Sequence, residues 1–206
     1  MWWTNPRKMT VSGGLTVLAL ALALLARRPC CWLAALAMAI STVGDGLLAG
    51  YPKLFAPVKD KLIKGGLLFF GAHILYILAL ITASGQDAAT LLPHFWGPFA
   101  VFGLLTVLHG AVFYFRAPSR PPLWFFAAAF FYLLIVAIHV SAAICVSGQL
   151  GGRLLLNIVG AVLFFLSDAI LLAHKYGFGK EELVSDLVWF TYAPAQLCLI
   201  LGFCLA

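Results

Sequence analysis

The chain has 206 residues, of which 64% are hydrophobic and 10% are charged, and its mean hydropathy is +1.04. Soluble domains carry about 25% charged residues, so this composition excludes an ordinary water-soluble domain. The net charge of +6 comes from basic residues dispersed through short loops, a distribution that does not indicate a nucleic-acid-binding surface. We expect an all-α fold, a polytopic transmembrane helical bundle.

The expected membrane spans are continuous apolar runs of about 20 residues. Seven such runs can be drawn, at about 11–26, 30–50, 62–83, 94–115, 122–146, 153–173 and 183–205. The first run resembles a signal peptide, but Arg27-Arg28-Pro29 stands where a cleavage site needs small residues, so we expect a retained span. No loop is large enough to fold separately, and residues 1–206 are therefore expected to form a single transmembrane helical domain.

Lysine and arginine residues favour alternate loops. The N-terminus and the loops after spans two, four and six carry 2, 4, 2 and 2 of them, whereas the other three loops carry 2, 0 and 1. The positive-inside rule then places the N-terminus in the cytoplasm and the C-terminus outside, which argues against a seven-helix G-protein-coupled receptor. Because the loops are compact, we expect a multi-pass protein of the bacterial inner membrane rather than of the endoplasmic reticulum.

Two aspartates, Asp45 and Asp168, lie inside apolar sequence, in Ser41-Thr-Val-Gly-Asp45-Gly-Leu-Leu and Phe164-Phe-Leu-Ser-Asp168-Ala-Ile-Leu. A carboxylate in the bilayer core is costly, so such residues face the bundle interior and mark functional sites. Two neighbouring carboxyl groups can keep one acid protonated while the other is ionised, which is a pattern of acid–base catalysis. The alternative for each aspartate is a structural hydrogen bond between helices.

Polar residues of other spans are expected at a similar depth, in the half of the membrane nearer the cytoplasm. They are His73, His109, Tyr192 and Gln196. Ser41 lies one helical turn before Asp45, so its hydroxyl is expected to reach that carboxylate or a ligand beside it. Two further pairs share a helix face by the same spacing rule: His73 with Tyr76, and Tyr192 with Gln196.

Four short motifs follow one another on separate expected spans. They are Ser41-Thr-Val-Gly-Asp45-Gly-Leu-Leu, Gly71-Ala-His73-Ile-Leu-Tyr76, Phe164-Phe-Leu-Ser-Asp168-Ala-Ile-Leu and Tyr192-Ala-Pro-Ala-Gln196-Leu. In order and rough spacing they resemble the lysoplasmalogenase family of multi-pass membrane proteins, the YhhN-like group, over about residues 38–203. Members of that family commonly have eight predicted spans where seven are drawn here, and a Tyr-Tyr pair where this chain has Thr191-Tyr192.

The resemblance implies hydrolysis of the vinyl ether bond of lysoplasmalogens, lysoplasmenylcholine and lysoplasmenylethanolamine. The products would be a fatty aldehyde and glycerophosphocholine or glycerophosphoethanolamine. A vinyl ether is hydrolysed by protonation of its β-carbon, and water then attacks the resulting oxocarbenium ion. A carboxylic acid can donate that proton, while a carboxylate stabilises the cation and orients the water, much as in glycoside hydrolysis.

On this interpretation Asp45 and Asp168 form the catalytic pair, with neither assigned as the acid. His73, counted with the catalytic residues, and Tyr76 would position water or the headgroup. Tyr192 and Gln196 would hydrogen-bond the glycerol or the vinyl ether oxygen. The hydroxyls of Ser41 and Ser167, near the aspartates in sequence, complete the expected substrate-binding set.

No metal or cofactor is expected. The expected partners are the lysophospholipid substrate and the surrounding membrane lipids, with no nucleic acid, and a homodimer is left open. One alternative is a metal-dependent lipid hydrolase of the ceramidase or progestin-receptor superfamily, with His73, His109 and His139 as zinc ligands, although no histidine pair has i,i+4 spacing. The other alternative is a proton-coupled or lipid transporter that uses the buried aspartates as proton carriers.

Overall fold

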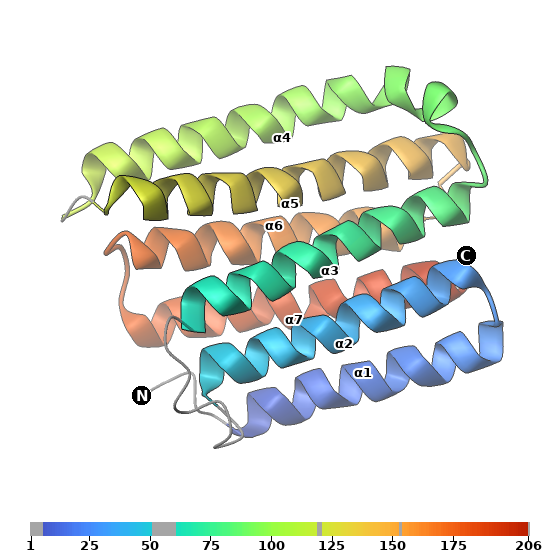
Figure 1. Cartoon of the computed structure of the whole chain (residues 1–206), viewed down its shortest axis with the longest axis horizontal. Helices are drawn as coiled ribbons and strands as arrows, with labels where there is room; N and C mark the ends of the chain where they lie inside the picture. Colours follow the sequence, from blue (N-terminus) through green and yellow to red (C-terminus); the bar gives the residue numbers. More distant parts are fainter. Residues whose placement is uncertain (1–5, 51–60, 119–120, 153, 206) are drawn as a thin grey trace.

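A computed structural model describes residues 6–50, 61–118, 121–152 and 154–205 of the chain (Figure 1). These residues form seven α-helices and no strand. The helices are α1 (Pro6–Ala26), α2 (Pro29–Ala49), α3 (Lys61–Ser84), α4 (Ala88–Arg116), α5 (Leu123–Gln149), α6 (Leu155–Lys175) and α7 (Glu181–Leu205). All seven are long and apolar enough to cross a membrane, so the predicted all-α transmembrane bundle is confirmed. An eighth span is not found among the described residues.

The helix ends follow local capping chemistry. The α4 helix begins at Ala88, not at residue 94 as hydropathy predicted, because the side chain of Asp87 accepts a hydrogen bond of 2.9 Å from the backbone N–H of Thr90. Hydrogen bonds from Thr90 also hold the pKa of Asp87 below its usual value. The α2 helix begins at Pro29, whose missing N–H is not needed in a first turn, and ends at Gly50 in the left-handed conformation (φ 63°).

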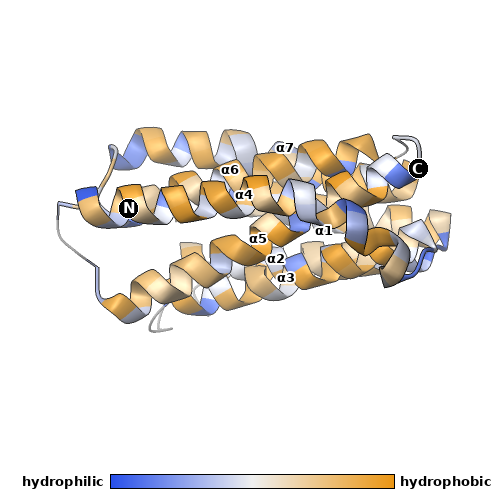
Figure 2. Ribbon diagram, turned by 90° about the horizontal axis from the view of Figure 1, so that it is seen from above, coloured by the Kyte–Doolittle hydropathy of each residue, from blue (hydrophilic) through white to orange (hydrophobic). Residues whose placement is uncertain are grey.

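The seven helices lie side by side and run in alternating directions (Figure 1). The α5 helix packs against α3, α4 and α6, while α2 packs against α1, α3 and α7. The most apolar segments of α1 and α4 are 17% and 11% buried, against 33–61% for the other helices, so these two are peripheral. Figure 2 shows apolar residues along most of every helix, with hydrophilic residues mostly near the two ends of the bundle.

Glycines bring two helix pairs into close contact. A Cβ atom on Gly160 of α6 would lie 2.8 Å from the carbonyl oxygen of Ala195 in α7, so these helices approach backbone to backbone. A Cβ atom on Gly65 of α3 would lie 2.9 Å from the side chain of Leu48 in α2. These contacts place α7 close against the helix that carries Asp168, and α3 close against the helix that carries Asp45.

Most of the described basic residues lie at one end of the bundle. The first residues of α1, α3, α5 and α7 and the last residues of α2, α4 and α6 lie at this end, on the left of Figure 1, whereas Arg27 and Arg28 lie at the other. The charge count also includes four residues that lie outside the described ones: Lys53, Lys59, Arg120 and Arg153. The positive-inside rule assigns the lysine-bearing end to the cytoplasm.

Candidate active site

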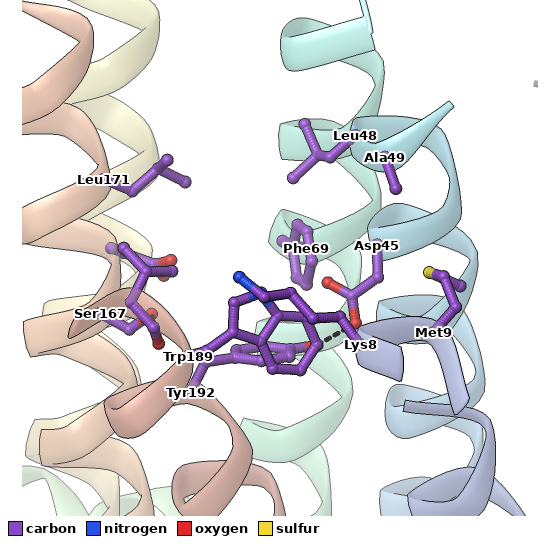
Figure 3. Close-up of a pocket in the computed structure, with 12 residues that line it drawn as sticks. Lys8, Met9, Asp45, Leu48, Ala49, Phe69, Ser167, Leu171, Trp189 and Tyr192 are labelled. Atoms are coloured by element: carbon purple, nitrogen blue, oxygen red, sulfur yellow. Dashed lines mark hydrogen bonds between the residues drawn. The ribbon is translucent and has the colours of Figure 1, made fainter. Parts of the chain in front are cut away.

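A small cavity lies inside the bundle near the lysine-bearing end (Figure 3). Its volume is about 40 Å³, which is room for a few water molecules, since one water needs about 10–15 Å³ of such space. Five helices line it, α1 with Lys8, α2 with Asp45, α3 with Phe69, α6 with Asp168 and α7 with Tyr192. The two aspartates that were expected to form a catalytic pair therefore line one cavity.

Asp45 is held by two hydroxyl groups from neighbouring helices. Ser12 of α1 donates to its Oδ2 atom, and the hydroxyl of Tyr192 in α7 donates to the same oxygen at 2.8 Å (Figure 3). The expected hydrogen bond from Ser41 is not formed, because the Asp45 carboxyl group reaches α1 and α7 instead. The buried Oγ of Ser41 has no partner among the described residues, and its other expected role, contact with a ligand, stays a prediction.

Asp168 has a different environment. Its side chain is buried, with 6% of the residue exposed, and the hydroxyl of Tyr132 in α5 donates to Oδ2 at 2.8 Å. The Nε2 atom of His73 in α3 lies 3.7 Å from the same oxygen. His73, which does not line the cavity, thus lies beside one aspartate, and Tyr192, which does line it, contacts the other. The catalytic role expected of His73 and the substrate-binding role expected of Tyr192 stay predictions.

Tyr76 and Gln196 form a buried support behind Tyr192. The amide nitrogen of Gln196 donates to the Tyr192 hydroxyl at 3.2 Å, and the hydroxyl of Tyr76 donates to the Gln196 amide oxygen at 2.6 Å. Both residues are fully buried and neither lines the cavity. In the structure they orient Tyr192, which in turn contacts Asp45.

His73 also contacts a second buried histidine. The Nδ1 atoms of His73 and His139 lie 3.1 Å apart, so one Nδ1 atom carries a hydrogen and donates a hydrogen bond to the other. The ring of His139 stacks on Tyr76 with centroids 5.5 Å apart and planes inclined by 6°. Sequence spacing does not connect these histidines, because they lie on α3 and α5, and the contact between those helices decides their pairing.

His109 lies outside this cluster. Its Nε2 atom is 2.9 Å from the backbone oxygen of Ala169, so it contacts the backbone of α6 and not the cavity. The three histidines of the zinc hypothesis are therefore not assembled. Across the described ranges, no group of three or more histidine, cysteine, aspartate or glutamate side chains could hold a metal ion.

The remaining cavity residues include a cation, Lys8, an aromatic ring, Trp189, and a hydroxyl group, Ser167. Lys8 donates to the hydroxyl of Ser185 at 2.6 Å, and its Nζ atom lies 5.4 Å from the ring centroid of Trp189. Ser167, expected to bind substrate, lines the cavity and donates to the backbone oxygen of Val188 at 3.3 Å. Lys8 and Trp189 were not predicted as site residues, since a basic residue and an aromatic residue at a span end are typical of any membrane protein.

The cavity combines two carboxyl groups, hydroxyl donors and space for water, with mostly apolar walls, an arrangement suited to proton transfer. Comparison with known protein families gives a match to the YhhN family over residues 8–203. No curated protein and no solved structure matches the chain. The matched range contains both aspartates and all the other cavity residues named above. The chain therefore belongs to the YhhN family, the family that includes lysoplasmalogenases.

Proposed function

We propose that this protein is a membrane-embedded hydrolase that cleaves the vinyl ether bond of lysoplasmalogens. The substrates would be lysoplasmenylcholine and lysoplasmenylethanolamine, and the products a fatty aldehyde with glycerophosphocholine or glycerophosphoethanolamine. Membership of the YhhN family is consistent with a membrane hydrolase. The observation that carries the proposal is that Asp45 and Asp168, from α2 and α6, line one small cavity inside the bundle, with room for a few water molecules.

The first stage of the reaction needs two proton transfers, one at each end of the same double bond. A carboxylic acid gives its proton to the β-carbon, and the α-carbon and ether oxygen become an oxocarbenium ion. Water attacks the α-carbon while the second, ionised carboxylate takes one of its protons. The hemiacetal that forms then breaks its C–O bond to the glycerol: its hydroxyl group gives up a proton to become the aldehyde oxygen, and the glycerol oxygen takes up a proton and leaves as the free hydroxyl.

The neighbours of the aspartates support this chemistry. The hydroxyls of Ser12 and Tyr192 fix one oxygen of Asp45 and leave its Oδ1 atom for the water or the proton. Tyr132 and His73 hold Asp168 from α5 and α3. Tyr192 is one hydroxyl that an ether or glycerol oxygen would meet on entering the cavity.

The test is aldehyde release by the purified protein in detergent or nanodiscs. Vinyl ether lysolipids are compared with their ester-linked counterparts. Loss of a general acid or base costs about 100-fold to 10,000-fold in rate, so Asp45→Asn and Asp168→Asn should each lose at least about 100-fold. Asp87→Asn is the matched control, because Asp87 is exposed and lies outside the cavity, and an amide can still cap α4.

Retained turnover in either purified, folded active-site variant would contradict the carboxyl pair. Release of fatty acid from the ester without release of aldehyde would instead indicate a different lipid hydrolase. If neither lipid is cleaved by the wild-type protein, the proposed hydrolysis is wrong, and the paired aspartates would be better explained by proton-coupled transport.

A further inference from the structure

A second, larger cavity reaches Asp168 from the side of the bundle. Its volume is about 290 Å³, close to that of small-molecule pockets, and it runs between α3 and α5. Its walls are almost entirely apolar, with Tyr132 and Asp168 as the polar residues among those that line it. Leu67 of α3 and Phe131 of α5 are 66% and 62% exposed on the outer surface, where the apolar part of a bilayer would contact them.

This apolar groove and the active-site cavity share one wall. Leu48, Phe69, Leu171 and Asp168 line both. Asp45 and Lys8 line only the active-site cavity. A molecule that occupied both spaces would therefore pass from apolar surroundings, past Asp168, into the cavity that Asp45 and the cationic Lys8 also line.

We propose that the apolar groove binds the single alkenyl chain of the lysolipid and that this orientation makes Asp168 the acid and Asp45 the base. The proposal rests on the function proposed above. A lysoplasmalogen has the same order of polarity as the path through the two cavities: a hydrocarbon chain, the vinyl ether, glycerol and an anionic phosphate. One groove accommodates one chain, which fits a lysolipid better than a diacyl lipid.

The assignment of the acid follows from the order of atoms in the substrate. The β-carbon of the vinyl ether is attached to the hydrocarbon chain, whereas the α-carbon is attached to the ether oxygen, which leads through the glycerol to the headgroup. With the chain in the groove, the β-carbon lies toward Asp168 and the α-carbon toward Asp45. The O–H bond of Asp168 then breaks as the new C–H bond forms, and Asp45 takes the proton of the water that attacks the α-carbon. That proton returns to Asp168 through solvent before the next turnover.

Gly66 offers a way to block the groove without disturbing the fold. It lies on α3 in the groove wall, and a Cβ atom built there meets no atom within 4 Å. Gly66→Leu should therefore place a side chain in the groove without a backbone clash, and leucine is a better helix former than glycine. Gly71→Leu is the matched control, because Gly71 is on the same helix, has equal space and lines neither cavity.

The readout is the ratio of kcat/KM for a long-chain vinyl ether lysolipid to that for a short-chain one. Gly66→Leu should lower this ratio about tenfold or more, as steric changes in apolar pockets do, while Gly71→Leu leaves it unchanged. An unchanged ratio in folded Gly66→Leu protein would overturn the groove assignment. Binding of the saturated, uncleavable 1-O-hexadecyl lysophosphocholine in nanodiscs gives an independent readout. Weaker binding to Gly66→Leu supports the groove even if the wild-type protein releases no aldehyde, and equal binding overturns it.

The acid and base roles are separated by rescue with sodium formate at neutral pH. In Asp45→Asn the oxocarbenium ion still forms, so formate can replace the lost carboxylate and restore aldehyde release. In Asp168→Asn the ion does not form, and formate should have no effect. Rescue of Asp168→Asn alone would reverse the assignment, whereas rescue of both variants or of neither would overturn the distinct roles.

Discussion

The two hydroxyl donors on Asp45 lead to a quantitative prediction. Ser12→Ala removes the donor from α1, and Tyr192→Phe removes the donor that lies 2.8 Å from Oδ2. If Asp45 acts as an ionised carboxylate, each donor stabilises the charge that this residue needs when it orients water. Both substitutions should then lower kcat of aldehyde release.

Each loss can be estimated from the type of hydrogen bond. A hydrogen bond to a charged group contributes about 1.5–3 kcal/mol, which corresponds to a decrease in kcat of about 10-fold to 150-fold. Tyr192→Phe has a second cost, because the amide nitrogen of Gln196 loses the buried hydroxyl that accepts its hydrogen bond. A buried donor without a partner costs about 1–3 kcal/mol, so Tyr192→Phe should also lower Tm while Ser12→Ala changes it less.

The assay is a double-mutant cycle on kcat, with Tm measured in the same detergent. Thr191→Val is the matched control, because among the described residues the Thr191 hydroxyl bonds to the backbone oxygens of Leu187 and Val188 and to no side chain. Since both donors bind one oxygen, their effects should be non-additive. If folded Ser12→Ala and Tyr192→Phe both keep kcat within about twofold of the wild type, where the hydrogen-bond energies require at least tenfold, the carboxylate role of Asp45 is refuted.

Four further outcomes are expected. His139→Phe leaves the Nδ1 atom of His73 without its buried partner, so kcat should fall about tenfold with KM unchanged. An unchanged kcat across the pH profile would contradict a positioning role for His139. Gly160→Ala should lower Tm, because overpacking costs about 1–3 kcal/mol while the gain in helix propensity is about 1 kcal/mol. Gly14→Ala should raise Tm, because a Cβ atom built on Gly14 meets no atom within 4 Å. Ser41→Ala removes a buried hydroxyl that lacks a partner among the described residues, so Tm should stay or rise, while an increase in KM would identify a ligand contact. EDTA should leave aldehyde release unchanged, and a loss that zinc restores would favour the metal-dependent alternative.

The spans were predictable because hydropathy is the main determinant of a membrane helix. The predicted start of α4 was wrong because Pro93 and His94 lower the hydropathy of the sequence just before the apolar run. The helix nevertheless begins after the cap at Asp87 and continues through Pro93 and Pro98. An Asp just before an apolar segment is a capping signal that a hydropathy window averages away. Local chemistry, and not mean hydropathy, thus sets this helix end.

The aspartates were recognisable because an ionisable residue in an apolar span is rare and costly, so it usually marks a functional site. Their hydroxyl partners were not. Ser12 is one of several hydroxyl residues in its helix. Tyr132 ends an aromatic-rich segment, residues 123–132, in which nothing distinguishes an inward ring from a lipid-facing one. Which face of α1 or α5 points inward depends on its neighbours, so these contacts follow from packing between helices that the sequence pattern does not encode.

The unequal surroundings of the two aspartates give independent support to the acid and base roles proposed for them. Asp45 receives two hydroxyl hydrogen bonds on one oxygen, an environment that suits a negative charge. Asp168 is buried against the apolar groove with one hydroxyl donor and His73 at 3.7 Å. A carboxyl group against apolar walls can hold a proton at neutral pH while a hydrogen-bonded neighbour stays ionised, and that is the division of labour that acid–base hydrolysis requires. The chain would therefore need both the groove and the hydroxyl pair, because identical environments would not distinguish the acid from the base.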